Sequence, residues 1–105
     1  MSYKLFLDDI RNPLDNGWEI VRSYEEFLTI IQERGKPRSI SFDHDLGEGG
    51  TGLDCVKWLI HDMRMDLRDV TITFHSENLV GVRNMWGLIL GWRNFCERRD
   101  EGERQ

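Results

Sequence analysis

Three short clusters of polar residues follow apolar runs of the sequence, and their residue types could do chemistry. The clusters are Asp8 and Asp9 after KLFL, Asp43, His44 and Asp45 after SISF, and His75 and Ser76 after VTITF. Neighbouring carboxylates repel each other, and they are worth that cost mainly where a cation, a proton or a substrate lies between them. The clusters therefore indicate a functional site.

The four carboxylates favour a hard divalent cation, Mg²⁺ or Mn²⁺, which prefers oxygen ligands and keeps several of its waters. Zinc is less favoured, because two histidines with dispersed aspartates and no cysteine pair lack its usual ligand spacing. His44 and His75 suit proton transfer near neutral pH. Arg11 can pair with a phosphate through its planar guanidinium, and Asn78 is placed to donate a hydrogen bond.

The elements that must position these residues follow from apolar patterning. Strands are predicted at 4–7, 18–22, 38–43 and 70–74, from apolar and β-branched runs. Helices are predicted from Ser23, which opens a capping box, to Gly35, from near Thr51 to Met63, and from Asn78 to about Arg98.

This order predicts an α/β fold, a three-layer sandwich around a mostly parallel four-stranded sheet with no fifth strand. Only the short segment IRNPLDNG separates the first two strands, fewer residues than a helical crossover needs. Either this crossover has shortened to a turn or the second strand is antiparallel. If the strands are parallel, the three clusters meet at the carboxyl edge, where open α/β sheets bind ligands.

Each cluster also has a plain structural interpretation. A pair of aspartates often forms a turn or caps a helix, Ser76 can cap the last helix, and His44 can be a core histidine. Coincidence would have to explain three such clusters at one edge of one sheet. A functional site is therefore the favoured interpretation.

Composition limits the class of protein. The chain has 105 residues and a formal net charge of −5, which predicts one domain and argues against coating duplex nucleic acid, although a short RNA end in a pocket remains open. Cys55 and Cys96 lie in apolar helical patterns, which predicts buried reduced thiols and a cytoplasmic location. Apolar runs are too short for a membrane span or a signal peptide. We expect a domain over 1–98 and a charged, frayed tail over 99–105.

Three motifs in order carry a resemblance to a known family. LFLDDIRNP, SFDHDLG and FHSENLVG resemble the cyclic-phosphate-processing receiver-like domains of bacterial and phage proteins, which are related to response-regulator receivers. The resemblance runs from about Leu5 to Met85. It implies an enzyme that acts on cyclic phosphates of nucleotides or RNA ends. Where the family pattern often has proline after the asparagine, this chain has Leu79.

Carried over residue by residue, the resemblance implies a role for each polar position. The catalytic set is His44, His75 and Asp43, the phosphate-binding set is Arg11, Ser76 and Asn78, and the metal set is Asp8, Asp9 and Asp45. Asp8 or Asp9 with Asp43 or Asp45 would hold the cation. The two histidines would divide the acid and base roles, in an order that the sequence leaves open. A metal-free mechanism with the histidine pair alone also stays open.

The parent receiver fold suggests the main rival function, a phosphoacceptor signalling domain. Such a domain has an acidic pair after its first strand, a phosphoacceptor aspartate after its third, a Ser or Thr after its fourth and a lysine after its fifth. The last lysine of this chain is Lys57, so the final feature has no counterpart. The enzyme is therefore ranked first, the phosphoacceptor second and a non-catalytic phosphate-binding module third.

The last predicted helix is apolar on more than one stripe. Leu88, Trp92 and Phe95 lie partly off the face that Val82, Met85 and Ile89 set. A second apolar face can bury itself within the monomer or against a partner. We expect a homodimer through this helix, and a monomer mass from light scattering at high micromolar concentration would contradict it.

Overall fold

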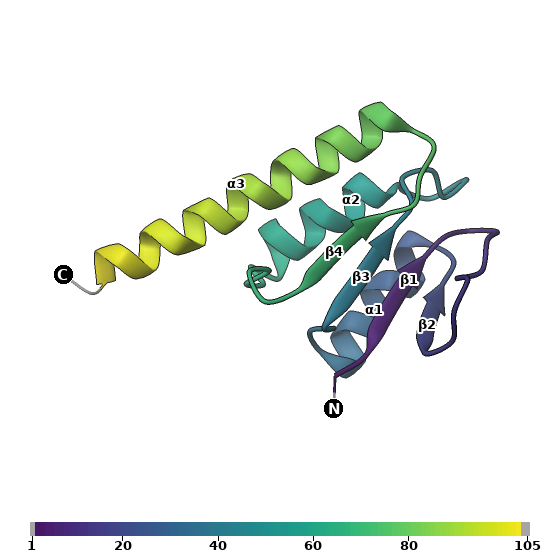
Figure 1. The fold of residues 1–105 in the computed structure, drawn as a ribbon, viewed down its shortest axis with the longest axis horizontal. Coiled ribbons are helices and arrows are strands. Elements are labelled where there is room, and N and C mark those ends of the chain that lie inside the picture. Colours follow the sequence, from purple (N-terminus) through teal and green to yellow (C-terminus); the bar gives the residue numbers. More distant parts are fainter. Residues whose placement is uncertain (1, 104–105) are drawn as a thin grey trace.

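The computed structural model describes residues 2–103 and contains one four-stranded sheet with helices (Figure 1). The strands are β1 (Lys4–Leu7), β2 (Trp18–Val21), β3 (Ser39–Phe42) and β4 (Thr71–Phe74). The helices are α1 (Tyr24–Arg34), α2 (Gly52–Lys57), which continues into the π-helical turn η1 (Trp58–Asp62), and α3 (Leu79–Glu103). Each element lies where the sequence predicts one.

All strands are parallel, in the order β2-β1-β3-β4, so the predicted α/β fold with a parallel four-stranded sheet is confirmed. Of the two alternatives for the first connection, the shortened crossover is correct. Residues 8–17 form a loop without a helix, and β2 lies parallel to β1. Among residues 2–103 no strand follows β4. The residues that follow β1, β3 and β4 therefore leave the sheet at one edge.

The helices lie on one face of the sheet, so the layers number two rather than the expected three. The chain crosses the sheet in one direction from β2 to β3 and on to β4, and right-handed crossovers place α1 and α2 on the same face. Figure 1 shows both helices behind the strands and α3 alongside α2, and α2 contacts both α1 and α3. The connection from β1 to β2 crosses the sheet in the opposite direction, so a helix in it would cover the other face. This connection is a loop, and among the described residues that face has no helix.

Side-chain burial matches this arrangement. Leu5, Leu7, Ile40 and Phe42 point toward the helices and are fully buried. We call the opposite side of the sheet the open face, and its strand residues are Lys4, Phe6, Trp18, Ile20, Ser39, Ser41, Thr71 and Thr73. Thr71 and Thr73 on this face are exposed. The hydrophobic core thus lies between the sheet and one layer of helices.

Side-chain caps fix where the helices begin. Ser23 Oγ accepts the amide of Glu26 at 3.1 Å at the start of α1. Thr51 and Asp54 form a reciprocal capping box at the start of α2. Asn78 Oδ1 accepts the amide of Gly81 at 2.9 Å at the start of α3. The N-terminal turns of all three helices are therefore held by polar side chains from the preceding loops.

Helix α3 continues through Glu103, past the expected domain boundary at residue 98. Arg68 Nη2 donates to Asp100 Oδ2 at 2.6 Å and ties this end to the loop before β4. Residues 104 and 105 of the expected tail, and Met1, lie outside the described residues. None of the helices among residues 2–103 is long and apolar enough to cross a membrane.

The second apolar stripe of α3 packs partly within the monomer. Trp92 is buried, and its Nε1 donates to the carbonyl of Met65 at 2.7 Å. Phe95 stacks on Trp92 and stays 48% exposed. Trp92 is thus part of the core, while Phe95 remains on the surface that the expected homodimer would use. The dimer itself stays a prediction.

Both cysteines are buried and free. Burial, followed by the charge of Asp54, raises the pKa of the Cys55 thiol, so this thiol stays protonated at neutral pH.

Gly52, at the first turn of α2, should not tolerate a side chain. A Cβ on Gly52 would overlap the carbonyl oxygen of Asp43. We expect Gly52→Ala to lower the free energy of unfolding by about 1–3 kcal/mol, because overpacking forces the backbone to shift. Gly87 in α3 has open space around it, so Gly87→Ala should instead stabilise by about 0.5–1 kcal/mol. Urea unfolding of both variants tests this, and an unchanged Gly52→Ala midpoint would contradict the close approach of α2 to the site.

Candidate active site at the carboxyl edge of the sheet

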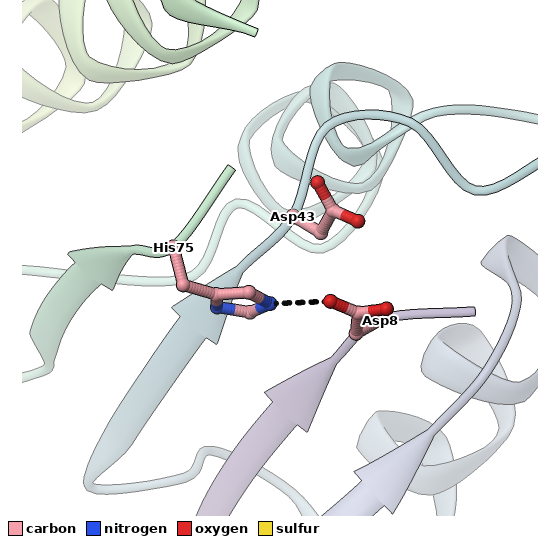
Figure 2. Close-up of side chains that lie close together, drawn as sticks. All are labelled: Asp8, Asp43 and His75. Carbon is pink, nitrogen blue, oxygen red and sulfur yellow. Dashed lines mark hydrogen bonds and ion pairs between the residues drawn. The ribbon is translucent and has the colours of Figure 1, made fainter. Parts of the chain in front are cut away.

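Asp8, Asp43 and His75 come together just beyond the ends of β1, β3 and β4. The register pairs Leu7 with Phe42 and Phe42 with Phe74, so the next residue of each strand reaches the same level of the edge. Figure 2 shows Asp8 and His75 hydrogen-bonded to each other, with the carboxylate of Asp43 beside them. One ligand atom from each of the three residues lies within 4.8 Å of the others.

Asp8 is a buried carboxylate whose oxygens are both engaged. Its Oδ1 accepts the amides of Ile10 at 2.9 Å and Arg11 at 2.8 Å, and its Oδ2 lies 3.0 Å from His75 Nε2. Burial opposes ionisation, but the hydrogen bonds from Arg11, Ile10 and His75 together hold the pKa of Asp8 below its ordinary value.

The sign of this shift makes Asp8 a carboxylate at neutral pH. A free aspartate ionises at about pH 3.9. The ionised form of Asp8 therefore contributes stability that is complete above that pH and is lost as the pH falls through the lower folded pKa. The charge on Asp8 is thus part of the folded state.

His75 links Asp8 to the strand β3. Since an ionised carboxylate can only accept, Nε2 of His75 carries the proton in its bond to Asp8. Its Nδ1 lies 2.7 Å from Ser41 Oγ, and its ring stacks on Phe6 with centroids 4.3 Å apart. Contacts on both ring nitrogens and on one ring face hold the imidazole in place.

Asp43 keeps one oxygen available. Its Oδ1 accepts the amide of His44 at 2.8 Å, and among residues 2–103 no group hydrogen-bonds its Oδ2. The side chain is nevertheless buried, because α2 begins against the Asp43 backbone. A buried carboxylate with a free oxygen beside a second carboxylate is suited to binding a cation.

A second histidine–carboxylate pair lies at the other side of the site. His44 Nδ1 lies 2.8 Å from Asp45 Oδ1, and Asn78 Nδ2 donates to the same oxygen at 3.2 Å. These hydrogen bonds, that of His44 first, lower the pKa of Asp45. The ring of His44 packs against Gly81 in the first turn of α3, where a Cβ would overlap it.

Arg11 and Ser76 lie beside the aspartates of the site. Arg11 Nη1 donates to the carbonyl of His75 at 3.2 Å, and its Nη2 lies 3.5 Å from Glu77, so the guanidinium crosses from the loop 8–17 to the end of β4. Ser76 Oγ accepts the amide of Asn78 at 3.1 Å. The guanidinium of Arg11 remains half exposed and can meet a ligand.

These residues enclose a hollow of about 230 Å³, which we call the acidic cleft. Its lining is Asp8, Asp9, Ile10, Arg11, Asp43, Asp45, Gly47, Ser76 and Glu77. Six of the nine sequence-predicted residues therefore meet in one cleft. The other three are His44, His75 and Asn78, and each hydrogen-bonds to an aspartate that lines it.

The charges of the acidic cleft strongly favour a cation. Four aspartates and Glu77 face one arginine. An anionic phosphate would be repelled by this lining unless a divalent cation bridged it to the carboxylates. Asp8, Asp43 and His75 are the described residues that could together hold such a cation.

Two residues of the site were missed by the sequence analysis. Ser41 lies within a strand, and its only sequence signal is that it alternates away from the core residues Ile40 and Phe42. Arg22 follows β2, outside the three polar clusters, yet its Nη1 donates to the carbonyls of Asp8 and Arg11. Arg22 therefore fixes the start of the loop 8–17, and nothing in its local sequence marks that role.

Comparison with known proteins identifies the chain by its family. No curated protein and no solved structure matches it. Residues 3–91 match the family model of the cyclic-phosphate processing receiver domain, which covers most of the sequence and all the residues of the acidic cleft. The chain belongs to the family of cyclic-phosphate processing receiver domains.

Proposed function

We propose that this protein is a phosphoesterase that opens cyclic phosphates of nucleotides or RNA ends with the help of a divalent cation. One observation carries the proposal: a buried, ionised Asp8 is bonded to His75 beside the free oxygen of Asp43, in a chain of a cyclic-phosphate processing family. A cation-binding carboxylate pair and a proton-carrying group are what the hydrolysis of a phosphodiester requires.

Asp8 and Asp43 would hold the cation, and Asp9 and Asp45 line the same cleft. When bound, Mg²⁺ or Mn²⁺ supplies positive charge that polarises the phosphoryl oxygens. Arg11 adds a second positive charge that binds the phosphate through its half-exposed guanidinium. The hydroxyl proton of Ser76 can donate to the same group, because within residues 2–103 its Oγ serves only as an acceptor, for the amide of Asn78.

We assign the two histidines different tasks. Because Asp8 holds the Nε2 proton of His75, the proton that this imidazole can give as an acid to the leaving ribose oxygen is the one on Nδ1, which passes through the hydroxyl of Ser41. Ser41 on the other nitrogen accepts a hydrogen bond when the ring is doubly protonated and donates one when it is neutral. His75 can therefore lose and regain a proton without moving.

His44 acts through Asp45. The exposed carboxylate of Asp45 faces the acidic cleft, and His44 lies behind it against α3. We assign to this pair the removal of a proton from the attacking water. Asn78 positions the pair, since it caps α3 with its carbonyl oxygen and donates to Asp45 with its amide.

A phosphoacceptor function is the second candidate, and the free oxygen of Asp43 favours it. Asp43 follows β3, and Ser76 follows β4, as the phosphoacceptor and the hydroxyl residue do in a receiver. In the part of the chain described, no lysine lines the acidic cleft. The acyl phosphate of a receiver would thus lack its usual ion-pair partner here, which places this function second.

Cation binding should stabilise the fold. Millimolar Mg²⁺ or Mn²⁺ should raise the melting temperature of the wild type, because a ligand of the folded state shifts the unfolding equilibrium. The double variant Asp8→Asn/Asp43→Asn should show no such rise. Differential scanning fluorimetry measures both, with Asp69→Asn, an exposed aspartate far from the cleft, as the control. Equal shifts in the wild type and the double variant would remove the cation from the mechanism.

A further inference from the structure

The open face of the sheet carries a second pocket next to the acidic cleft. It encloses about 340 Å³, a size typical of pockets that bind small molecules. We call it the aromatic pocket, and its lining is Phe6, Arg11, Asn12, Pro13, Leu14, Asp15, Trp18, Ser41 and His75. The pocket is open because the connection 8–17 is a loop. A crossover helix in its place would cover Phe6 and Trp18.

The aromatic pocket adjoins the acidic cleft, because Arg11 lies in the lining of both. His75 lines the aromatic pocket, while its Nε2 bonds Asp8 in the cleft. A ligand whose phosphate lies in the cleft can therefore extend past Arg11 and His75 onto the open face. The part that extends would meet the apolar surfaces of Pro13, Leu14 and Trp18.

The walls of the aromatic pocket are held in place without a ligand. Trp18 Nε1 donates to Asp15 at 2.9 Å, and Lys4 Nζ lies 4.5 Å from the centre of the Trp18 ring. Phe6 meets Trp18 edge to face and stacks on His75. A preformed aromatic wall lowers the entropy cost of binding a flat ring.

We infer that the aromatic pocket binds the nucleobase of a nucleoside phosphate whose phosphate occupies the acidic cleft. The inference rests on the proposed function and adds to it the site that binds the base, which would favour a nucleoside cyclic phosphate over a cyclic phosphate without a base. Flat aromatic and apolar walls suit the faces of a base, while Asn12, Asp15 and Ser41 offer polar groups to its edge. An aliphatic alcohol attached to the phosphate would leave these walls uncovered.

Binding of hydrolysis products tests the inference without any need for turnover. Adenosine 3′-monophosphate and base-free glycerol 2-phosphate are titrated in the presence of Mg²⁺ by isothermal calorimetry. We expect the nucleotide to bind the wild type more tightly, and Trp18→Ala to weaken it by about 10–100-fold while glycerol 2-phosphate changes less than about twofold. Leu14→Ser should also weaken nucleotide binding, but by a smaller factor. Because the side chain of Leu14 is fully exposed, this substitution should leave the fold intact.

Trp86→Ala is the matched control, because Trp86 is partly exposed on α3 and lies outside the aromatic pocket. Nucleotide affinity should not change in this variant. The inference would be overturned if the wild type bound both probes equally well. It would also be overturned if Trp18→Ala lowered the affinity for both probes by the same factor, or if the wild type bound neither probe.

The failure of this inference and of the proposed function give different results. If the nucleotide binds through Trp18 but no cyclic phosphate is opened, the base-binding pocket is supported and the phosphoesterase function is rejected. If glycerol 1,2-cyclic phosphate is opened as fast as adenosine 2′,3′-cyclic phosphate, the phosphoesterase function is supported and the base-binding pocket is rejected.

Discussion

Replacing His75 with alanine is expected to lower the rate of cyclic-phosphate opening by roughly 10²–10⁴-fold. The loss follows from the position of the imidazole, which bonds Asp8 through Nε2 and Ser41 through Nδ1. Steady-state assays with adenosine 2′,3′-cyclic phosphate measure the rate, and circular dichroism checks that the variant is folded.

The variant His75→Gln separates proton transfer from positioning. A glutamine amide can still donate to Asp8 but cannot exchange a proton at neutral pH. We therefore expect His75→Gln to be as inactive as His75→Ala. His61, an exposed histidine of η1 outside the acidic cleft, is the control, and His61→Gln should keep full activity. Near-normal activity of His75→Gln would reduce His75 to a residue that only positions Asp8.

The second large effect is expected at His44. His44→Ala should also lower the rate by roughly 10²–10⁴-fold, because Asp45 would lose the imidazole that supports it. Gly81→Ala should also lower the rate although it removes no polar side chain, since its Cβ would displace the His44 ring. Gly91→Ala is the matched control, because Gly91 lies on the same helix with open space around it. Full activity of both His44→Ala and Gly81→Ala would exclude His44 from the mechanism.

The sequence was sufficient to predict the strands, the helices and the edge where the polar residues meet. Apolar runs such as KLFL report buried strands directly, and parallel strands bring the residues after them together. The start of α2 near Thr51 and of α1 at Ser23 could also be predicted, because capping is a local interaction.

The number of layers could not be predicted in the same way. It depends on the direction in which each connection crosses the sheet, and the short segment 10–17 left the orientation of β2 open. Once β2 is known to lie parallel beside β1 at the sheet edge, the right-handed rule assigns α1 and α2 to one face. The open face and its aromatic pocket are consequences of that topology rather than of any motif.

The histidine–carboxylate hydrogen bonds of the site could not be predicted from the sequence either. The two histidines were expected to divide the acid and base roles, but nothing in the sequence showed that each bonds a carboxylate that lines the acidic cleft. Such pairings depend on side-chain rotamers and on neighbours distant in the sequence, such as Ser41 for His75 and Gly81 for His44.

Turnover of a cyclic phosphate is the most direct measurement of the central claim. Purified wild-type protein is incubated with Mn²⁺ and adenosine 2′,3′-cyclic phosphate, and the products are separated by chromatography. We predict conversion to adenosine 2′- or 3′-monophosphate, with the rate in Asp43→Asn lowered by roughly 10²–10⁴-fold. Absence of turnover on nucleotide and RNA cyclic phosphates, together with a stable acyl phosphate formed at Asp43 from acetyl phosphate, would contradict the enzyme and establish the phosphoacceptor instead.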